Sequence, residues 1–417
     1  MKQNAMKLSI PFYVRTVLAR LAAGGHEAYA VGGCVRDALD GRVPHDWDVC
    51  TSALPEETKA CFPGFRVVET GIRHGTVTVL PEEEPVEITT YRVDGAYSDG
   101  RHPDAVSFTR SLREDLARRD FTINAMAYRP AEVSAEPAPG ETGADAVDTD
   151  GELVDPFGGR EDLRRRLIRC VGDPNARFSE DALRILRALR FSAVLRCRIE
   201  PDTADAARRL RGTLAAVSPE RRLVELRKLL TGADAADVLR AFSDVIAAAA
   251  PGLPEDAAAK RAETVGRAPC ELDVRLAVLL HGLDAQAILH GLRAERALVE
   301  RVGFLVERMD EPFPSDPPGI RRLLRDAGPD AARSLARTVG ADETALNAVL
   351  ASGGCWSVGQ LAVRGADLIK AGLQPGPQLG RTLGALLDAV MDETLPNERT
   401  ALLDAAVRMA EETPPRG

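Results

Sequence analysis

The sequence predicts an α+β fold, in which an N-terminal domain with a mixed β-sheet and helices is followed by all-α domains. Two observations predict this fold. Alternating or continuous apolar runs, the pattern of strands, fall before residue 158. From Arg160 onward, apolar residues recur with the 3.6-residue period of helices. With 417 residues, the chain has room for two to four compact units of roughly 150 residues each.

The first elements can be placed in order. Residues 11–22 predict an amphipathic helix that begins at Pro11. EAYAVGG predicts a strand that ends in a glycine turn, and CVRDALDG predicts a helix. Further strands are predicted at WDVCT, FRVVETG, GTVTVL and VEITTYRV. Residues 131–150 contain almost no large apolar side chain and predict a mobile surface insertion, after which the fold should resume at LVDPFGG.

The second part of the chain predicts helices only. Its clearest periodic segments are EDALRILRALRFSAVL, DTADAARRLRGTLAAV and PERRLVELRKLL. Breaks at PGLPED, EPFPSDPPG, ASGG and LQPGP separate further helices.

Composition narrows the class of protein. The hydrophobic share of 45% and the charged share of 28% are typical of a soluble globular protein and exclude a disordered chain. The seven cysteines are scattered without a Cys-x-x-Cys pair, which favours reduced thiols. The N-terminus has no apolar signal region, and no run of eighteen apolar residues occurs elsewhere. We therefore expect a cytoplasmic protein with no membrane partner.

The net charge of −9 hides an asymmetry. Residues 158–230 contain eighteen basic and ten acidic side chains, so this segment carries +8 and the remainder −17. Because phosphate contacts are supplied by Lys and Arg, the arginine-rich middle is the part of the chain suited to a nucleic-acid partner.

The segment HDWDVCT is the strongest candidate for a metal site. In a strand, Asp46 and Asp48 would lie on one side, with Trp47 and Val49 turned towards the core. Two neighbouring carboxylates repel one another, and Mg²⁺ favours a few carboxylates together with substrate phosphate oxygens. The alternative is a solvated strand edge, which is the common explanation of an isolated Asp-x-Asp.

The segment VGGCVRD, just upstream, could cradle a polyphosphate. A strand that ends at Gly32 and Gly33 before a helix lets backbone N–H groups approach phosphates closely. The positively charged guanidinium of Arg36 adds two further N–H donors. Alone, Gly-Gly before a helix is more often only a tight turn.

Two further segments add polar groups. Glu87 lies between Val86 and Ile88 in an apolar strand, so it could complete the acidic set or face solvent. In RRDFTINAMAY, Arg119 and Asp120 could orient a sugar or a triphosphate, or form an ion pair at a helix start.

The helix predicted at FSEDALRILRALRF suggests nucleotide selection. Asp181, Arg184 and Arg187 fall on one face. An Asp acceptor beside an Arg donor matches cytosine and adenine, which both offer an exocyclic amino donor beside a ring-nitrogen acceptor. An unmatched base would leave a buried polar group unpaired. The alternative is an ordinary surface ion pair.

Taken in order, GGCVRD, HDWDVC, VEITTYR, RRDFTINAMA, DPFGG and EDALRILRALRF resemble the class II CCA-adding tRNA nucleotidyltransferases and the related bacterial poly(A) polymerases. The resemblance covers about residues 28–230. It implies a nucleotidyltransferase head at 1–157, a nucleotide-selecting neck at 158–217, a helical body at 218–325 and a tRNA-binding helical tail at 326–417.

The resemblance also implies the site and the reaction. Asp46 and Asp48 would bind two Mg²⁺ ions, with Glu87 completing the acidic set. The implied nucleotide contacts are Gly33, Arg36 and Arg119, with the CTP and ATP site formed by Asp181, Arg184, Arg187 and Arg190. The implied substrates are CTP, ATP and tRNA that lacks all or part of its 3′ CCA, and pyrophosphate is released.

Related enzymes that add only CC lack part of a loop before the RRDFT segment. Here the loop retains Asp99 and Arg101, which resemble an element associated with adding the terminal A. We therefore expect full CCA addition. The open alternatives are a CC-adding enzyme, a poly(A) polymerase and an RNA-binding protein with an inactive head.

Overall fold

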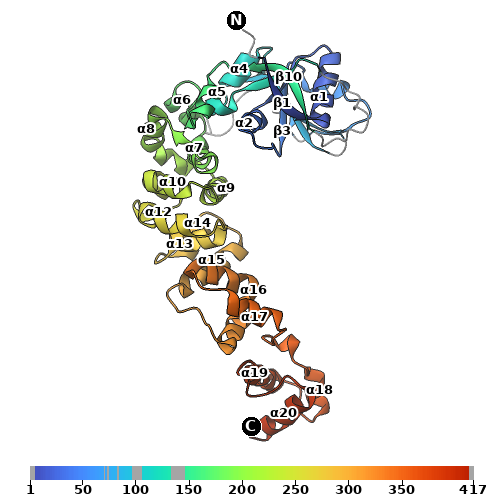
Figure 1. Ribbon diagram of the computed structural model, residues 1–417, viewed down its shortest axis with the longest axis vertical. Helices are drawn as coiled ribbons and strands as arrows, with labels where there is room; N and C mark the ends of the chain where they lie inside the picture. The colour runs from blue at the N-terminus through green and yellow to red at the C-terminus, as the bar shows by residue number, and fades with distance from the viewer. Residues whose placement is uncertain are drawn as a thin grey trace. The chain divides into compact units, whose positions relative to one another are not determined.

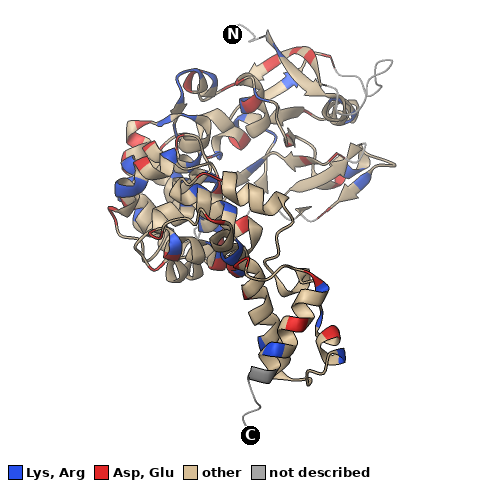
Figure 2. Ribbon diagram, turned by 60° about the horizontal axis from the view of Figure 1, so that its bottom comes forward, with Lys and Arg blue, Asp and Glu red and all other residues tan. Residues whose placement is uncertain are grey.

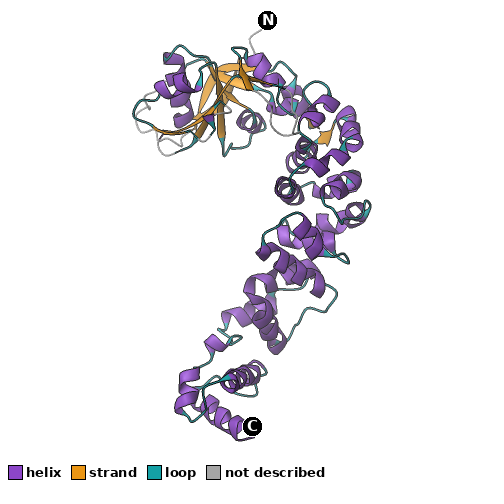
Figure 3. Ribbon diagram, turned by 180° about the vertical axis from the view of Figure 1, so that it is seen from behind, coloured by secondary structure: helices purple, strands orange, loops and turns teal. Residues whose placement is uncertain are grey.

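The computed structural model describes residues 5–69, 71–72, 75–81, 84–95, 106–132 and 146–412. Two compact units divide the chain. The first contains residues 1–262 with 291–293, and the second contains 263–290 with 294–417. Strands are concentrated in the N-terminal part of the first unit, and helices make up nearly all of the remaining chain (Figure 1, Figure 3). The predicted α+β class is confirmed.

The N-terminal part is built on an eight-stranded mixed sheet with the order β1-β10-β9-β2-β3-β6-β5-β4. Its strands are β1 (Ala5–Pro11), β2 (Ala28–Val31), β3 (Trp47–Thr51), β4 (Arg66–Val68), β5 (Thr76–Leu80), β6 (Val86–Thr90), β9 (Ala127–Pro130) and β10 (Ala146–Val154). A separate antiparallel pair joins β7 (Arg92–Asp94) to β8 (Val106–Phe108).

Strands β3 and β6 form the parallel pair in this sheet, with Asp48 opposite Glu87. Trp47 and Val49 are buried, whereas Asp48 is exposed. The pleat sends alternate side chains to opposite faces, as the sequence predicts for this segment. Both acidic positions are therefore held at neighbouring points of the sheet.

The expected insertion at 131–150 is wrong in its last five residues. Residues 146–150 belong to β10, which pairs with β1 from Ala5 opposite Glu152 to Pro11 opposite Ala146. The side chains at 146–148 are exposed, so this stretch lacks the apolar alternation that marks a half-buried strand. Backbone pairing with β1 forms the strand instead.

Short helices connect the strands of the sheet, and the first two lie where the sequence predicts them. Helix α1 begins directly after Pro11, and α2 follows the glycine turn, both as predicted. These helices are α1 (Phe12–Ala23), α2 (Gly33–Leu39), α3 (Pro55–Ala60), α4 (Leu112–Ala117) and α5 (Gly159–Arg164), with a 3₁₀ turn at Thr122–Asn124.

The rest of the first unit is helical apart from a two-stranded pair, β11 (Leu167–Ile168) with β12 (Arg198–Ile199). Its helices are α6 (Pro174–Glu180), α7 (Leu183–Leu195), α8 (Pro201–Arg209), α9 (Pro219–Leu230), α10 (Ala235–Ala241) and α11 (Ser243–Ala249), with a 3₁₀ turn at Arg211–Ala216. Helix α12 (Ala257–Arg267) spans the boundary between the two units.

The helix predicted across residues 178–191 is not continuous. Helix α6 ends at Glu180 and α7 begins at Leu183, with Asp181 in an extended conformation between them. The Asp181 carboxylate accepts a hydrogen bond from the Leu183 backbone N–H at 3.0 Å. Short polar side chains compete with helical hydrogen bonds in this way, which explains the break.

The second unit contains helices with their own cores. They are α13 (Leu272–Leu280), α14 (Ala285–Gly291), α15 (Arg296–Arg308), α16 (Pro317–Val339), α17 (Thr344–Ala351), α18 (Gly365–Lys370), α19 (Pro377–Met391) and α20 (Arg399–Glu412). Helix α16 is kinked where Gly328 precedes Pro329. One buried cluster, which includes Leu368, Leu386 and Leu402, holds α18 to α20 together.

A buried tyrosine beneath the sheet gives a first testable prediction. Tyr91 is fully buried beside Tyr29 and Cys50, and none of the described residues gives its hydroxyl a hydrogen-bond partner. Because an unpaired buried hydroxyl costs about 1–3 kcal/mol, we expect Tyr91→Phe to raise the free energy of unfolding by about 1 kcal/mol.

Tyr128→Phe is the matched control. Its hydroxyl donates towards the Thr149 carbonyl oxygen at 2.5 Å and lies 3.0 Å from the Met6 carbonyl oxygen. We expect this variant to lower the free energy of unfolding by about 1 kcal/mol. Urea unfolding of both variants measures the two changes in the free energy of unfolding. A loss of stability in Tyr91→Phe would contradict the prediction.

Candidate functional site

One cavity in the first unit contains most of the side chains that the sequence singles out. Its volume is about 600 Å³. Its walls come from the turn before α2, the start of β3, the segment after α4, the α6–α7 break, α7 itself and α9. The residues that line it are Gly32, Gly33, Arg36, Asp46, Asp48, Arg118, Arg119, Asp120, Asn124, Asp181, Leu183, Arg184, Arg187, Arg190, Phe191 and Arg221.

The charges of the cavity suit an anionic ligand. Seven arginines and four aspartates line it, which gives a net charge of +3. Basic positions recur among the helices after the sheet, interspersed with acidic ones (Figure 2). One arginine guanidinium can donate two parallel hydrogen bonds to a phosphate group, so the lining of this cavity suits a polyphosphate.

Two of the lining carboxylates come from the start of β3 and the residue before it. Asp46 and Asp48 line the cavity, while Glu87 lies opposite Asp48 on β6 and is not among its lining residues. Although the Asp48 side chain is exposed at the cavity, the protein atoms around its carboxylate remove part of its hydration. This desolvation, the Glu87 charge and the Asp46 charge raise the pKa of Asp48 to about 6, although Arg119 opposes them. A carboxylate crowded by other carboxylates in this way is suited to a bound cation. Within the described ranges, no three His, Cys, Asp or Glu side chains form a metal-binding group.

The glycine turn before α2 lies close to Arg119. Gly32 has a φ of 83°, a conformation that residues with a Cβ rarely adopt. A Cβ added there would lie 3.0 Å from Nη1 of Arg119. The Gly32 N–H donates to the Met126 carbonyl oxygen at 3.1 Å, which ties the turn to the segment before β9. Glycine at this position therefore keeps Arg119 in the cavity wall.

Arg36 is fixed beside the turn. Its Nη1 donates to Oδ1 of Asn124 at 2.7 Å, and its guanidinium also pairs with Asp37. Only 8% of Arg36 is exposed. Asn124 in turn donates to Asp120, so the predicted Arg36 and Asp120 belong to one hydrogen-bonded network.

Asp120 connects this network to α7. Its carboxylate accepts from Nε of Arg187 at 2.7 Å. Burial alone would raise the pKa of Asp120, but Arg187 and the Asn124 amide outweigh it and lower the pKa from 3.8 to about 2. The sheet domain and the arginines of α7 are thereby held together across the cavity.

The lowered pKa gives a pH prediction. A carboxylate with a depressed folded pKa contributes stability above its unfolded pKa and loses it as pH falls through the folded value. Asp120 should therefore contribute roughly 2 kcal/mol at pH 7, lost between about pH 4 and pH 2. We expect Asp120→Asn to lower stability at pH 7 and to weaken the acid dependence in that window. Urea unfolding from pH 2 to pH 7 measures both. An unchanged acid dependence would contradict the assignment.

Asp181 and Arg184 both line the cavity, although they do not share the one helix that was predicted for them. Nη1 of Arg184 donates to Oε2 of Glu180 at 2.6 Å, and Nη2 donates to the Arg118 carbonyl oxygen at 3.2 Å. Oδ2 of Asp181 accepts from Nη2 of Arg221 at 3.0 Å. Both side chains are thus positioned by neighbouring protein groups.

Phe191 provides an aromatic surface for three of the arginines. The guanidinium carbons of Arg36, Arg187 and Arg190 lie 5.2, 5.4 and 4.0 Å from its ring centroid. Cation–π contacts of this kind orient a guanidinium without neutralising its charge. The same arginines also pair with Asp37, Asp120 and Glu225, so the ring contacts and these ion pairs together fix the three guanidinium groups in the cavity wall.

Sequence reasoning missed several residues of the cavity. Arg118 and Asn124 lie in segments that it did examine, so proximity to Arg119 and Asp120 was an available signal. Phe191 follows Arg184 and Arg187 at i+7 and i+4 on α7, so helical periodicity was an available signal for it, whereas Arg221 reaches the site only through the packing of α9 on α7. The predicted Asp99 and Arg101 lie outside the described residues.

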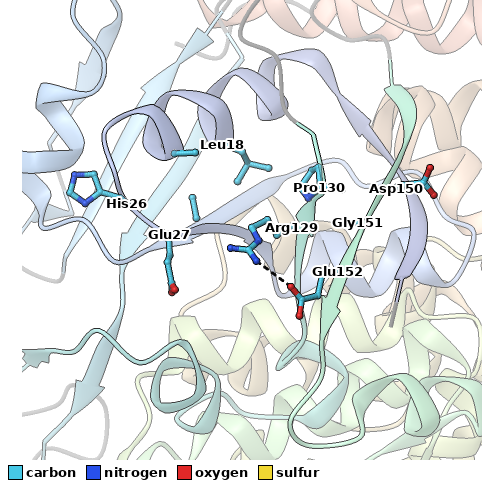
Figure 4. A pocket seen from close by; sticks show the side chains of 11 residues that line it. Leu18, His26, Glu27, Arg129, Pro130, Asp150, Gly151 and Glu152 are labelled. Atoms are coloured by element: carbon cyan, nitrogen blue, oxygen red, sulfur yellow. Dashed lines mark hydrogen bonds and ion pairs between the residues drawn. The ribbon is translucent and has the colours of Figure 1, made fainter. Parts of the chain in front are cut away.

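A second cavity of about 480 Å³ lies beside α1, β9 and β10 (Figure 4). Arg129 and Glu152 form an ion pair in its wall, with His26, Glu27 and Asp150 around it. None of the predicted site residues lines this cavity. The larger cavity is therefore the candidate site.

Comparison with known proteins agrees with this geometry. Residues 28–169 match the family described as "Poly A polymerase head domain", and residues 197–245 match "Probable RNA and SrmB- binding site of polymerase A". Residues 352–406 match "tRNA nucleotidyltransferase domain 2 putative". A CCA-adding enzyme of Limosilactobacillus fermentum is 38% identical over 407 residues, covering 94% of this chain and 95% of the relative.

The chain belongs to the CCA-adding enzyme family. A Geobacillus kaustophilus CCA-adding enzyme is 37% identical, covering 92% of this chain and 93% of the relative. The crystal structure of the Bacillus stearothermophilus CCA-adding enzyme in complex with CTP is similar with a TM-score of 0.79 and 32% identity, covering 96% and 97% of the two chains. The resemblance predicted from the motifs is confirmed.

None of the helices in the described part of the chain has the length and apolarity that a membrane span requires.

Proposed function

We propose that this protein rebuilds the 3′ CCA end of tRNA by adding C, C and A from CTP and ATP, without a template and with release of pyrophosphate. The observation that supports it most is the single cavity that Asp46 and Asp48 line together with seven arginines and Asp181. Relatives that match nearly the whole chain are named CCA-adding enzymes. We place this tRNA reaction in the cytoplasm.

The reaction forms a bond between the tRNA 3′ oxygen and the α-phosphorus and breaks the bond to the β-phosphate. We assign two Mg²⁺ ions to Asp46 and Asp48, with Glu87 supporting Asp48 from the neighbouring strand. When bound, these ions would lower the pKa of the 3′ hydroxyl and neutralise the leaving pyrophosphate. The raised pKa of Asp48, caused first by burial and then by Glu87, supports this assignment because a cation would relieve that repulsion.

The arginines and glycines position the nucleotide in this proposal. Arg36, Arg119, Arg187 and Arg190 bind the triphosphate, and the turn at Gly32 and Gly33 leaves room for it. Asp120 holds Arg187 in place.

Base selection is assigned to two side chains. Asp181 would accept from the exocyclic amino group of cytosine or adenine, and Arg184 would donate to the ring nitrogen beside it. Uracil and guanine would each leave a polar group unpaired.

We further propose that the head extends over 1–157, the neck over 158–217, the body over 218–325 and the tail over 326–417. The tail would bind tRNA, and Asp99 and Arg101 would assist addition of the terminal A.

Product sequencing tests the proposal. Purified protein with Mg²⁺, CTP and ATP is incubated with tRNA that lacks its 3′ CCA, and we expect C, C and A to be added. Products that stop at CC would indicate a CC-adding enzyme, and a long A tail would indicate a poly(A) polymerase. tRNA binding without incorporation would indicate an inactive head.

A further inference from the structure

Two helices of the first unit are followed by an arginine in the left-handed conformation. Arg166 lies after α5 with a φ of 53°, and Arg196 ends α7 with a φ of 56°. Glycine is favoured at such a helix end, because a Cβ there crowds the neighbouring backbone. Nε of Arg196 lies 3.9 Å from Oδ1 of Asp234, and 70% of the Arg196 side chain is exposed. A protein contact this long does not explain an arginine where glycine is favoured.

The two turns lie side by side at the surface. Beyond them, β11 pairs in parallel with β12, with Leu167 opposite Arg198. The Arg198 N–H donates to the Arg166 carbonyl oxygen at 2.8 Å. The side chains of Arg166, Arg196 and Arg198 are all exposed. The strand pair therefore holds three arginines on adjacent turns.

Asp40, at the end of α2, adds a fourth arginine to this group. Its carboxylate is 8% exposed and pairs with Nη1 of Arg166 at 2.8 Å and with Nε of Arg42 at 3.0 Å. One carboxylate thus serves two guanidinium groups. We call Arg42, Arg166, Arg196 and Arg198 the turn arginines. Four arginines with two aspartates, Asp40 and Asp234, leave a net charge of +2 at this surface.

The turn arginines lie outside the cavity but close to its carboxylates. None of them is among the lining residues. Arg42 precedes Asp46 by four residues, which span at most about 14 Å. Helix α2, which ends beside Asp40, begins at Gly33 in the cavity wall. A positive surface therefore lies beside the candidate metal site and apart from the nucleotide.

We propose that the turn arginines bind backbone phosphates of the tRNA near its 3′ end. This inference rests on the proposed addition of nucleotides to that end. A strand whose 3′ oxygen reaches the ions at Asp46 and Asp48 carries phosphates within a few nucleotides of that point. Exposed guanidinium groups are the usual partners of such phosphates, and the charge of the surface has the required sign. Phosphate binding also gives a reason for arginine at the two left-handed positions.

A structural role is the competing explanation, and it is strongest for Arg166. The pair between Arg166 and Asp40 joins the turn after α5 to α2. Arg42 would still pair with Asp40 in an Arg166 variant. Arg196 has a longer ion pair and a more exposed side chain than Arg166, so it separates the two explanations more sharply.

Two substitutions of Arg196 separate its charge from its backbone conformation. Arg196→Gln removes the charge and keeps a side chain at the left-handed position, whereas Arg196→Gly removes both. We expect Arg196→Gly to melt about 2 °C above Arg196→Gln, because glycine is favoured there. Both variants should bind tRNA that lacks its 3′ CCA about tenfold more weakly at about 0.1 M salt, because one counterion fewer is released.

Fluorescence anisotropy over a series of salt concentrations measures this binding. The slope of log K against log salt concentration should become shallower by about 1 in each Arg196 variant. It should become shallower by about 2 when Arg166→Gln is combined with Arg196→Gln. An unchanged slope in both Arg196 variants would overturn the proposal. Affinity that follows the melting temperature, with Arg196→Gly binding better than Arg196→Gln, would favour the structural role and overturn it as well.

Arg129→Gln is the matched control. The Arg129 side chain is 46% exposed and lies in the wall of the second cavity, so this variant removes the same charge away from the turns. We expect its affinity for tRNA to stay within twofold of the unsubstituted protein. Equal losses in Arg129→Gln and Arg196→Gln would mean that overall charge, and not this surface, determines binding.

Neutral methylphosphonate linkages, placed one at a time in the tRNA, locate the contact. A linkage within a few nucleotides of the 3′ end should weaken binding to the unsubstituted protein but not to Arg196→Gln. If only distant linkages behave in this way, the placement near the 3′ end is wrong. Addition of C, C and A by the unsubstituted protein is measured separately, so failure of the proposed function is distinguishable from failure of this surface.

Discussion

Replacing Asp46 and Asp48 together by asparagine is expected to reduce nucleotide addition at least about a thousandfold, because several kcal/mol of metal-dependent transition-state stabilisation would be lost. The two side chains line the same cavity as seven arginines. Asparagine has a similar volume but lacks the charge that binds Mg²⁺. Single-turnover incorporation of CTP into truncated tRNA measures the loss.

The same substitutions should leave the fold intact or stabilise it. Burial and the Glu87 charge raise the pKa of Asp48 from 3.8 to about 6, so the folded chain holds a proton more tightly than the unfolded chain. Stability from this group is present below about pH 4 and is lost as pH rises through about 6. At pH 8 and without Mg²⁺, we therefore expect Asp48→Asn to melt at a higher temperature than the unsubstituted protein.

Added Mg²⁺ provides the control. Mg²⁺ should raise the melting temperature of the unsubstituted protein, because a ligand that binds the folded state stabilises it. It should have little effect on the double variant. Substantial incorporation by a folded double variant would contradict the assignment of Asp46 and Asp48.

Much of the head could be predicted because its sequence signals are local. The glycine turn, the Asp-x-Asp strand and the helix after Pro11 each carry their pattern within a few residues, and each lies where it was predicted. Residues 146–150 of β10 could not be predicted in this way. Their pairing partner is β1, at the other end of the domain, and their own side chains at 146–148 are exposed.

The sequence could indicate which residues belong to the candidate site, but the arrangement that it predicted for Asp181 and Arg184 was wrong. A period of 3.6 residues placed Asp181 and Arg184 on one helical face, but hydrogen bonding from Leu183 to the Asp181 side chain ends one helix and begins another. The partner of Asp181 is Arg221, which the pairing of α7 with α9 brings into the cavity. Local periodicity contains no information about such a contact.

Replacing Arg184 by alanine is expected to lower kcat/KM roughly a hundredfold for both CTP and ATP, because losing a hydrogen bond from a charged guanidinium and leaving the ring nitrogen unpaired costs about 3 kcal/mol. The Arg184 side chain is 11% exposed, lines the cavity and is held by Glu180 at 2.6 Å. Its guanidinium is thus oriented before a base arrives. Steady-state kinetics with each nucleotide measures the loss.

Arg177 provides a control that separates base reading from support of Glu180. Its guanidinium also pairs with Glu180, on the other carboxylate oxygen, but Arg177 is not among the residues that line the cavity. If Arg184 contacts the base directly, Arg177→Ala should keep kcat/KM within a few-fold of the unsubstituted protein, since Arg184 still has Glu180 and the Arg118 carbonyl oxygen as partners. Equal losses in the two variants would mean that Glu180, positioned by both arginines, is the group on which nucleotide binding depends.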